Sequence, residues 1–140
     1  MTATPFNEGH QVHLLKGGVE FFPALVRAID TSVHEVRLET YIFNFDAAGE
    51  TVCAALERAG LRGVRVYLVM DGIGTPGVPD PWIQRFAHAS VRWHRFSPLG
   101  RWGLLMPGGW RRLHRKLCVV DAHTAFCGGI NILDDYVDPA

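Results

Sequence analysis

The sequence predicts an α/β fold: a mixed, largely parallel β-sheet flanked by helices, in α-β-α layers. Extended and helical patterns alternate along the chain, as in domains built around a parallel sheet. Residues 64–72 are apolar on both faces near their end, which is typical of a buried parallel strand. Two short β-rich segments close the pattern as a hairpin. The length of 140 residues fits one domain, residues 1–140, and a hydrophobic share of 48% excludes a disordered chain.

The first half of the chain is expected to contain two extended segments and two helices. Residues 12–18 read as a short strand and turn, and residues 34–45, rich in β-branched and aromatic residues, read as a longer strand. Residues 20–32 and 49–63 read as helices, the second ending at a glycine. Their apolar residues recur at helical spacing: Phe22, Leu25, Val26 and Ile29 in the first, and Val52, Ala55, Leu56 and Ala59 in the second.

The second half is expected to add strands to the same sheet. Residues 64–72 and 91–96 read as strands, separated by a short helix over 80–90 with a proline in its first turn. Residues 116–121 and 124–129 read as the strands of the closing hairpin.

The three cysteines form no CxxC pair and leave an odd number. Cys118 and Cys127 lie within apolar runs, so we expect buried thiols of a reduced compartment. The first residues lack the pattern of a signal peptide, and no apolar run approaches the ~20 residues needed to span a bilayer. The protein is therefore expected to be cytoplasmic or peripheral to a membrane.

Basic residues are concentrated in one part of the chain. Residues 81–120 contain eight Arg or Lys and no Asp or Glu, although the net charge of the whole chain is zero. Such a block indicates an anionic partner, with phosphate on a lipid or a nucleic acid as the chemistry. The alternative is a solvated basic face whose acidic partners come from elsewhere in the fold.

The segment 97–113 is too rich in glycine and proline for a helix and too apolar for an ordinary loop. Tryptophan beside arginine suits a lipid–water boundary, where an amphipathic ring and a long cationic side chain are both satisfied. The predicted lipid contacts are Trp102, Leu105, Trp110, Arg111 and Arg112. The alternative is that the tryptophans pack against their own domain or a partner subunit.

The candidate catalytic residues begin at the entry to the fourth expected strand. His114 and Lys116 are two residues apart, so their side chains leave the same face, while Arg115 points away. A neutral imidazole can attack phosphorus and form a covalent intermediate, which makes His114 the candidate nucleophile. Asp121 closes the same strand.

The candidate phosphate-binding groups follow. Gly128 and Gly129 would let backbone N–H groups approach a ligand closely, and Asn131 adds a side-chain amide donor. Together with Lys116, these groups would stabilise the charge that develops on the non-bridging oxygens of a phosphodiester.

Other site types have no support. A zinc site would need further ligands at short spacing, and the ammonium of Lys116 would repel the ion. The sequence contains no GxSxG, GxxxxGK[ST] or GxGxxG motif, so neither a serine hydrolase nor nucleotide binding is indicated.

The motif H-x-K-x4-D-x6-G-G-x-N over residues 114–131 resembles the HKD signature of the phospholipase D superfamily. Residues 14–43, 55–75 and 114–136 resemble the amino-terminal half of bacterial cardiolipin synthases. The resemblance implies phosphatidyl transfer between two phosphatidylglycerol molecules through a phosphohistidine, with no metal or other cofactor.

The resemblance also implies residue roles. His114 is the expected nucleophile, Lys116 and Asn131 the phosphate clamp, and Asp121 an orienting or structural carboxylate in the catalytic set. Glu39 could hold a histidine by a hydrogen bond.

Members of the superfamily use two HKD motifs, and the second histidine protonates the leaving alcohol, whereas this sequence holds one motif. We therefore expect a domain that is incomplete at its C-terminus, possessing only the first catalytic half and inactive alone. The alternative is a homodimeric single-HKD phosphodiesterase or nuclease that joins two copies and acts on nucleic acid. The expected partners are anionic phospholipid, the bacterial membrane surface, and a second HKD half or second copy. The expected location is the cytoplasmic face of the membrane.

Overall fold

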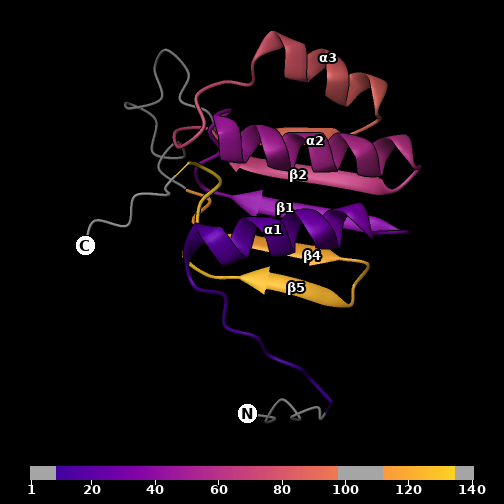
Figure 1. The fold of residues 1–140 in the computed structure, drawn as a ribbon. Coiled ribbons are helices and arrows are strands. Elements are labelled where there is room, and N and C mark those ends of the chain that lie inside the picture. The colour runs from indigo at the N-terminus through magenta and orange to yellow at the C-terminus, as the bar shows by residue number, and fades with distance from the viewer. Residues whose placement is uncertain (1–8, 98–111, 135–140) are drawn as a thin grey trace, which may run out of the picture.

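A computed structural model describes residues 9–97 and 112–134 of the chain (Figure 1). The elements are α1 (Gly17–Asp30), β1 (Glu35–Thr40), α2 (Ala47–Leu61), β2 (Arg65–Asp71), α3 (Asp80–His88), β3 (Arg92–Phe96), β4 (Leu117–Val120) and β5 (Thr124–Cys127). The strands form one sheet in the order β3-β2-β1-β4-β5. β1, β2 and β3 are parallel, whereas β4 is antiparallel to both β1 and β5. The predicted mixed sheet with a closing hairpin is confirmed.

The described helices lie on one face of the sheet (Figure 1), so the described residues form two layers and not the predicted α-β-α layers. The crossovers β1-α2-β2 and β2-α3-β3 both step toward the same edge, and right-handed crossovers of that kind place their helices on a common face. The opposite face carries polar and aromatic residues: the guanidinium carbons of Arg37 and Arg92 lie 4.8 and 5.7 Å from the ring centroid of Tyr67.

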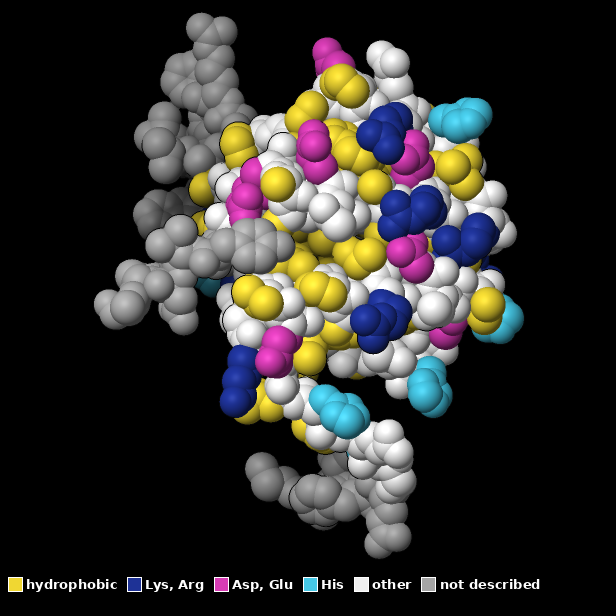
Figure 2. Space-filling view, in the orientation of Figure 1, with side chains coloured by type: hydrophobic (Ala, Val, Ile, Leu, Met, Phe, Trp, Pro, Cys, Tyr) yellow, Lys and Arg dark blue, Asp and Glu magenta, His cyan; other side chains and the backbone are white. Residues whose placement is uncertain are grey.

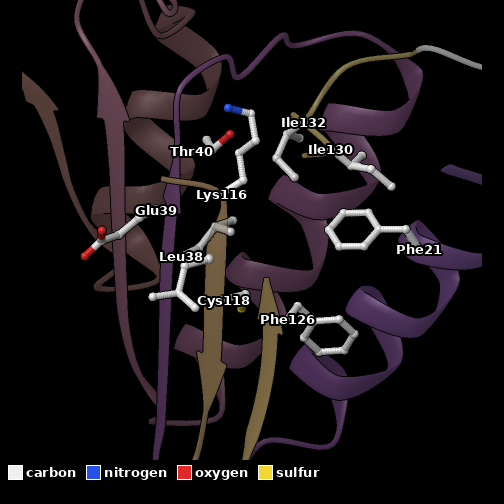
Figure 3. A pocket seen from close by; sticks show the side chains of 10 residues that line it. Phe21, Leu38, Glu39, Thr40, Lys116, Cys118, Phe126, Ile130 and Ile132 are labelled. Atoms are coloured by element: carbon white, nitrogen blue, oxygen red, sulfur yellow. The ribbon is translucent and has the colours of Figure 1, made fainter. Parts of the chain in front are cut away.

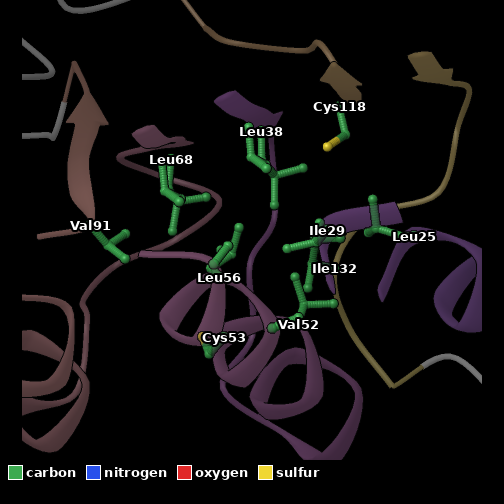
Figure 4. Packing of buried hydrophobic residues seen from close by; sticks show 14 of the residues in the cluster. Leu25, Ile29, Leu38, Val52, Cys53, Leu56, Leu68, Val91, Cys118 and Ile132 are labelled. Atoms are coloured by element: carbon green, nitrogen blue, oxygen red, sulfur yellow. The ribbon is translucent and has the colours of Figure 1, made fainter. Parts of the chain in front are cut away.

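The hydrophobic core lies between the sheet and the helices (Figure 4). In β1, Val36, Leu38 and Thr40 are buried while the alternate residues are more exposed, as expected for a strand with one covered face. Leu25 of α1 and Leu56 of α2 are fully buried against this face. Burying a side chain of this size contributes about 1.5–3 kcal/mol, so the core fixes how α1 and α2 pack on the sheet.

Two predictions about the first half of the chain need correction. Residues 12–18 form no strand; α1 begins at Gly17, and Val12 and Leu14 are 90% and 85% exposed. The reason is that a strand needs a hydrogen-bonded neighbour, and no strand of the described chain pairs with this segment. The strand expected over 34–45 ends at Thr40, and the residues after it turn toward the site described below.

One of the cysteine predictions is also wrong. Cys53 and Cys118 are buried, but Cys127 is exposed. Cys127 pairs with Leu117 on the uncovered face of β5, which is the edge strand of the sheet, so its apolar neighbours in sequence do not bury it.

No helix within the described ranges is long and apolar enough to cross a membrane.

Candidate active site

The candidate site lies at the end of the sheet where strands β1 and β2 finish and strand β4 starts. Glu39 of β1 pairs with Leu117 of β4, and the two strands run in opposite directions. The residue that follows β1, Tyr41, therefore lies beside the residues that precede β4. The same end of the sheet also receives the segment 129–132, whose Ile132 forms an isolated bridge with Phe43.

The structure brings His114 and Lys116 together at the ring of Tyr41. The imidazole of His114 is stacked on that ring, with centroids 4.5 Å apart and planes inclined by 20°. The ammonium nitrogen of Lys116 lies 5.6 Å from the centroid of the same ring. It also donates a hydrogen bond of 3.3 Å to the backbone carbonyl of His114. His114 is solvent-exposed, so a bulky phosphodiester can reach it.

Asn131 anchors the last part of the motif to the same end of the sheet. Its Oδ1 accepts the backbone N–H of Ile42 at 3.1 Å. The next residue, Ile132, donates its N–H to the carbonyl of Ile42 and accepts from the N–H of Asn44. Because the oxygen of the Asn131 amide is used in this way, the amide nitrogen is the end that can donate to an anion.

Of the two glycines of the motif, Gly128 has its backbone N–H engaged within the protein. The N–H of Gly128 is hydrogen-bonded to the carbonyl of Lys116 at 3.3 Å, which extends the β4–β5 hairpin by one rung. Neither Gly128 nor Gly129 has a positive φ, and a Cβ atom at either would meet nothing within 4 Å. Strand pairing therefore accounts for Gly128, and the open space beside Gly129 leaves its role as a phosphate donor a prediction.

Asp121 lies at the other end of β4 from Lys116. Its carboxylate accepts the backbone N–H groups of Val33, His34 and Glu35 at 2.8–2.9 Å. These three bonds, the largest from Glu35 and then Val33, hold the pKa of Asp121 below its usual value. The structure thus separates Asp121 from His114 and makes it a structural carboxylate that ties the β4–β5 turn to the start of β1.

The pKa of Asp121 fixes how its contribution to stability depends on pH. A folded-state pKa below the unfolded value means that the ionised form favours folding. The stabilisation is complete above the unfolded pKa and is lost as pH falls through the folded pKa.

A carboxylate outside the HKD motif, which was not predicted from the sequence, holds the backbone next to His114. Asp71, at the end of β2, is fully buried. Its Oδ1 accepts the N–H groups of Ile73 and Gly74 at 2.8 and 3.2 Å, and its Oδ2 accepts the N–H of Leu113 at 2.8 Å. Leu113 directly precedes His114, so Asp71 fixes the backbone from which the imidazole extends. The signal in the sequence was a lone aspartate at the end of an apolar strand.

The acidic partners of the basic block come from other elements, as the alternative interpretation expected. Within the block, three described arginines pair with carboxylates: Arg85 with Glu57, Arg112 with Asp71 and Arg115 with Glu39. Glu39 therefore contacts an arginine, and no described hydrogen bond joins it to a histidine. Lys, Arg, Asp and Glu side chains are interleaved on the helical face in Figure 2. These arginines are consequently weak evidence for an anionic partner.

Four of the five predicted lipid contacts, Trp102, Leu105, Trp110 and Arg111, lie outside the described residues. The fifth, Arg112, has a side chain that is 18% exposed; it donates to the carbonyl of Ser97 at 3.1 Å and lies 3.8 Å from Asp71. Its guanidinium thus faces the protein.

A small hollow adjoins Lys116 between α1 and the β4–β5 hairpin (Figure 3). It is shallow and partly open to solvent. Its walls are mainly apolar. The rings of Phe21 in α1 and Phe126 in β5 meet edge to face there, with centroids 6.1 Å apart. Within the described ranges, no cluster of three or more His, Cys, Asp or Glu side chains could hold a metal ion.

Comparisons with known proteins were made for the sequence and for the fold. Residues 25–138 match the family described as "Cardiolipin synthase, PLD-like domain". The chain is 33% identical to cardiolipin synthase B of Shigella flexneri over 132 residues, which is 94% of this chain and 32% of that protein. It is 37% identical to cardiolipin synthase B of Salmonella typhi over 126 residues, which is 90% of this chain and 30% of that protein. The chain thus spans about a third of the length of these relatives.

Two solved structures share the fold. Nuc of Salmonella typhimurium, a phospholipase D family member, gives a TM-score of 0.55 at 23% identity and covers 80% of this chain and 64% of its own. NucT of Helicobacter pylori gives 0.59 at 15% identity and covers 80% of this chain and 67% of its own. At these identities the likeness shows the fold alone. The resemblance to the superfamily predicted from the HKD motif is confirmed.

Proposed function

Because the chain belongs to the cardiolipin synthase family of phospholipase D-like domains, we propose that it carries the nucleophilic half of a phosphatidyltransferase. The observation that carries the proposal is the geometry at Tyr41, where an exposed imidazole, His114, lies beside the ammonium of Lys116. The reaction joins two phosphatidylglycerol molecules into cardiolipin and releases glycerol.

The reaction proceeds in two displacements at phosphorus. A ring nitrogen of His114 attacks the diester of the first phosphatidylglycerol, a P–N bond forms, and the P–O bond to the head-group glycerol breaks. The glycerol oxygen takes up a proton as it leaves. A hydroxyl of a second phosphatidylglycerol then attacks the phosphohistidine, loses its proton, and restores the free imidazole. Lys116 and the amide nitrogen of Asn131 stabilise the charge on the non-bridging oxygens in both steps.

A second histidine supplies the proton to the leaving glycerol. It belongs to a second HKD half or to a second copy of this chain. The proposal is supported by the single motif in the 140 residues and by the fraction of the relatives that the chain spans. By this proposal residues 1–140 form one phospholipase D-like domain that lacks part of the catalytic apparatus.

We also propose that the protein is peripheral and acts at an anionic membrane surface, because its substrate is a membrane lipid, and that this surface is the cytoplasmic face. Trp102, Leu105, Trp110 and Arg111 are the proposed lipid contacts, since their side chains suit the lipid–water boundary. Flotation with phosphatidylglycerol vesicles tests this. The double variant Trp102→Ala, Trp110→Ala is expected to float less than the wild-type chain; equal flotation would remove the tryptophans from the proposal.

The covalent step can be tested without the general acid. A phosphodiester with a p-nitrophenolate leaving group needs no protonation, because the phenolate is stable at neutral pH. The substrate carries a radioactive phosphorus atom. The chain is expected to release nitrophenolate in a burst equal to the amount of protein and to keep the labelled phosphoryl group bound covalently. Both are expected to be lost in His114→Ala and kept in His123→Ala, a control at an exposed histidine on the hairpin turn. Label that persists in His114→Ala would exclude His114 as the nucleophile.

A nuclease is the weaker alternative. The relatives of 33% and 37% identity named above are cardiolipin synthases, whereas the likenesses to Nuc and NucT are below 25% identity. Cleavage of DNA by the chain, without label from phosphatidylglycerol, would favour the nuclease.

A further inference from the structure

We propose that Tyr41 is a positioning residue, whose ring holds the imidazole of His114 in one orientation for attack on phosphorus. The proposal rests on the proposed role of His114 as the nucleophile. It concerns a residue outside the HKD motif, 73 positions before the histidine in the chain.

The contact between the two rings is a near-parallel stack. Their centroids are 4.5 Å apart and their planes are inclined by 20°. A stack of this kind limits rotation about the Cα–Cβ and Cβ–Cγ bonds of the histidine, because either rotation would drive the imidazole into the tyrosine ring or off its face. The two ring nitrogens of His114 lie in the imidazole plane, at the rim of the stack, so a phosphorus atom would approach them from the side and not through the tyrosine ring.

His114 needs such a support. It lies before the first paired residue of β4, Leu117, so strand hydrogen bonds do not hold it. It is exposed, and among the described residues Tyr41 is the aromatic side chain that contacts its imidazole. The hydrogen bond from the N–H of Leu113 to Asp71 fixes the backbone just before His114, but a fixed backbone still allows several rotamers of the histidine side chain.

Tyr41 is itself held from two sides. On one side, its carbonyl accepts the hydroxyl of Thr75 at 3.4 Å, and Gly74 lies so close that a Cβ atom there would be 2.3 Å from that carbonyl oxygen. On the other side, the neighbouring residue Ile42 is bound through both of its backbone groups, to the Asn131 side chain and to the N–H of Ile132. The ring is therefore presented from a fixed backbone.

The same ring also sets the spacing between the nucleophile and the cation. The ammonium nitrogen of Lys116 lies 5.6 Å from the Tyr41 centroid, within the range in which an aromatic face attracts a cation. The face of the ring makes these contacts, so the hydroxyl group is dispensable. A phenylalanine at position 41 should therefore keep the contacts with His114 and Lys116, whereas an aliphatic side chain should lose them.

The test compares Tyr41→Leu, Tyr41→Phe and the wild-type chain of 140 residues. Tyr67→Leu is the matched control, because Tyr67 lies on β2 and contacts Arg37 and Arg92 on the uncovered face of the sheet. The first measurement is the NMR chemical shift of the His114 ring C–H groups, assigned from their loss in His114→Gln. The second is the burst rate with the p-nitrophenyl diester at saturating substrate. Dispersed backbone amide signals establish that each variant is folded.

Stacking on a tyrosine ring shifts the histidine C–H signals upfield. We expect Tyr41→Leu to lose this shift and to slow the burst roughly tenfold to a hundredfold, with little change in the substrate concentration at half-saturation, because misplacing a reacting group raises the barrier. Tyr41→Phe and Tyr67→Leu are expected to match the wild-type chain in both measurements. Unchanged His114 signals in folded Tyr41→Leu, or an unchanged burst rate, would overturn the proposal.

The two measurements separate this proposal from the one on function. A wild-type chain that gives no burst contradicts His114 as a nucleophile. The chemical shifts then decide alone whether Tyr41 holds the ring: a shift lost with leucine and kept with phenylalanine supports the placement, and any other pattern contradicts it.

Discussion

Replacing Asp71 tests whether one buried carboxylate holds the backbone of the candidate site. Asp71 is fully buried and accepts three backbone N–H groups, from Ile73, Gly74 and Leu113. The guanidinium of Arg112 lies 3.8 Å away. In Asp71→Asn the side chain keeps its shape but has one acceptor oxygen instead of two, so it can serve either the first two donors or Leu113.

The expected cost follows from these contacts. A hydrogen bond to a charged group contributes about 1.5–3 kcal/mol, and the asparagine variant loses at least one such bond and the charge that faces Arg112. We therefore expect Asp71→Asn to lower the free energy of unfolding by roughly 2–4 kcal/mol, since at least one buried bond is lost. Asp71→Ala removes every acceptor and leaves Arg112 facing no carboxylate at this position, so about 3–5 kcal/mol is expected.

Urea unfolding followed by circular dichroism at pH 7 measures the effect. Asp80→Asn is the control, because Asp80 is an exposed carboxylate in the first turn of α3, where its loss should cost less than about 1 kcal/mol. Hydrogen exchange at the Leu113 amide reports the site directly and should accelerate in Asp71→Asn more than exchange in the core strands. A stability of Asp71→Asn equal to that of Asp80→Asn, with slow exchange at Leu113, would refute the reasoning.

Three further changes test other parts of the structure. Asp121→Asn should lower the free energy of unfolding at pH 7, and its difference from the wild-type chain should shrink as pH falls below 3.8, the usual pKa of an aspartate. Parallel urea titrations at neutral and acid pH check this. Gly74→Ala should lower the melting temperature, because its Cβ would lie 2.3 Å from a carbonyl oxygen, whereas Gly77→Ala on the same loop meets nothing within 4 Å and should be close to neutral. Exposed Cys127 should react with a maleimide in the folded chain, while Cys118, whose pKa burial raises to about 12, should react only after unfolding. Mass spectrometry measures the extent of labelling.

Each of these changes has a result that contradicts its reasoning. For Asp121, it is a stability difference that stays constant with pH, since the charge would then not be what the three backbone donors bind. For the glycines, it is equal melting temperatures of the two alanine variants. For the cysteines, it is rapid labelling of Cys118 in the folded chain, which would mean that β4 opens readily.

The sequence predicted the local elements well where a repeating pattern is enforced by burial. The stripe that includes Leu25 and Ile29 and the stripe that includes Val52 and Leu56 became the buried faces of α1 and α2, because an amphipathic helix has one way to remove its apolar side from water. The same reasoning failed for Cys127, since residues of an edge strand alternate between a covered and an open face whatever their neighbours are.

The sequence by itself determined the family and the residues that carry the proposed chemistry, because the intervals between His114, Lys116 and Asn131 are covalent and survive in any conformation. It could not determine which of the motif residues meet. Strand β4 separates Lys116 from Asp121, so the carboxylate of Asp121 lies at the opposite end of the strand and accepts three backbone N–H groups. Only the antiparallel pairing of β4 with β1 brings Tyr41 under the histidine, and contact between residues so distant in the chain is a property of tertiary packing.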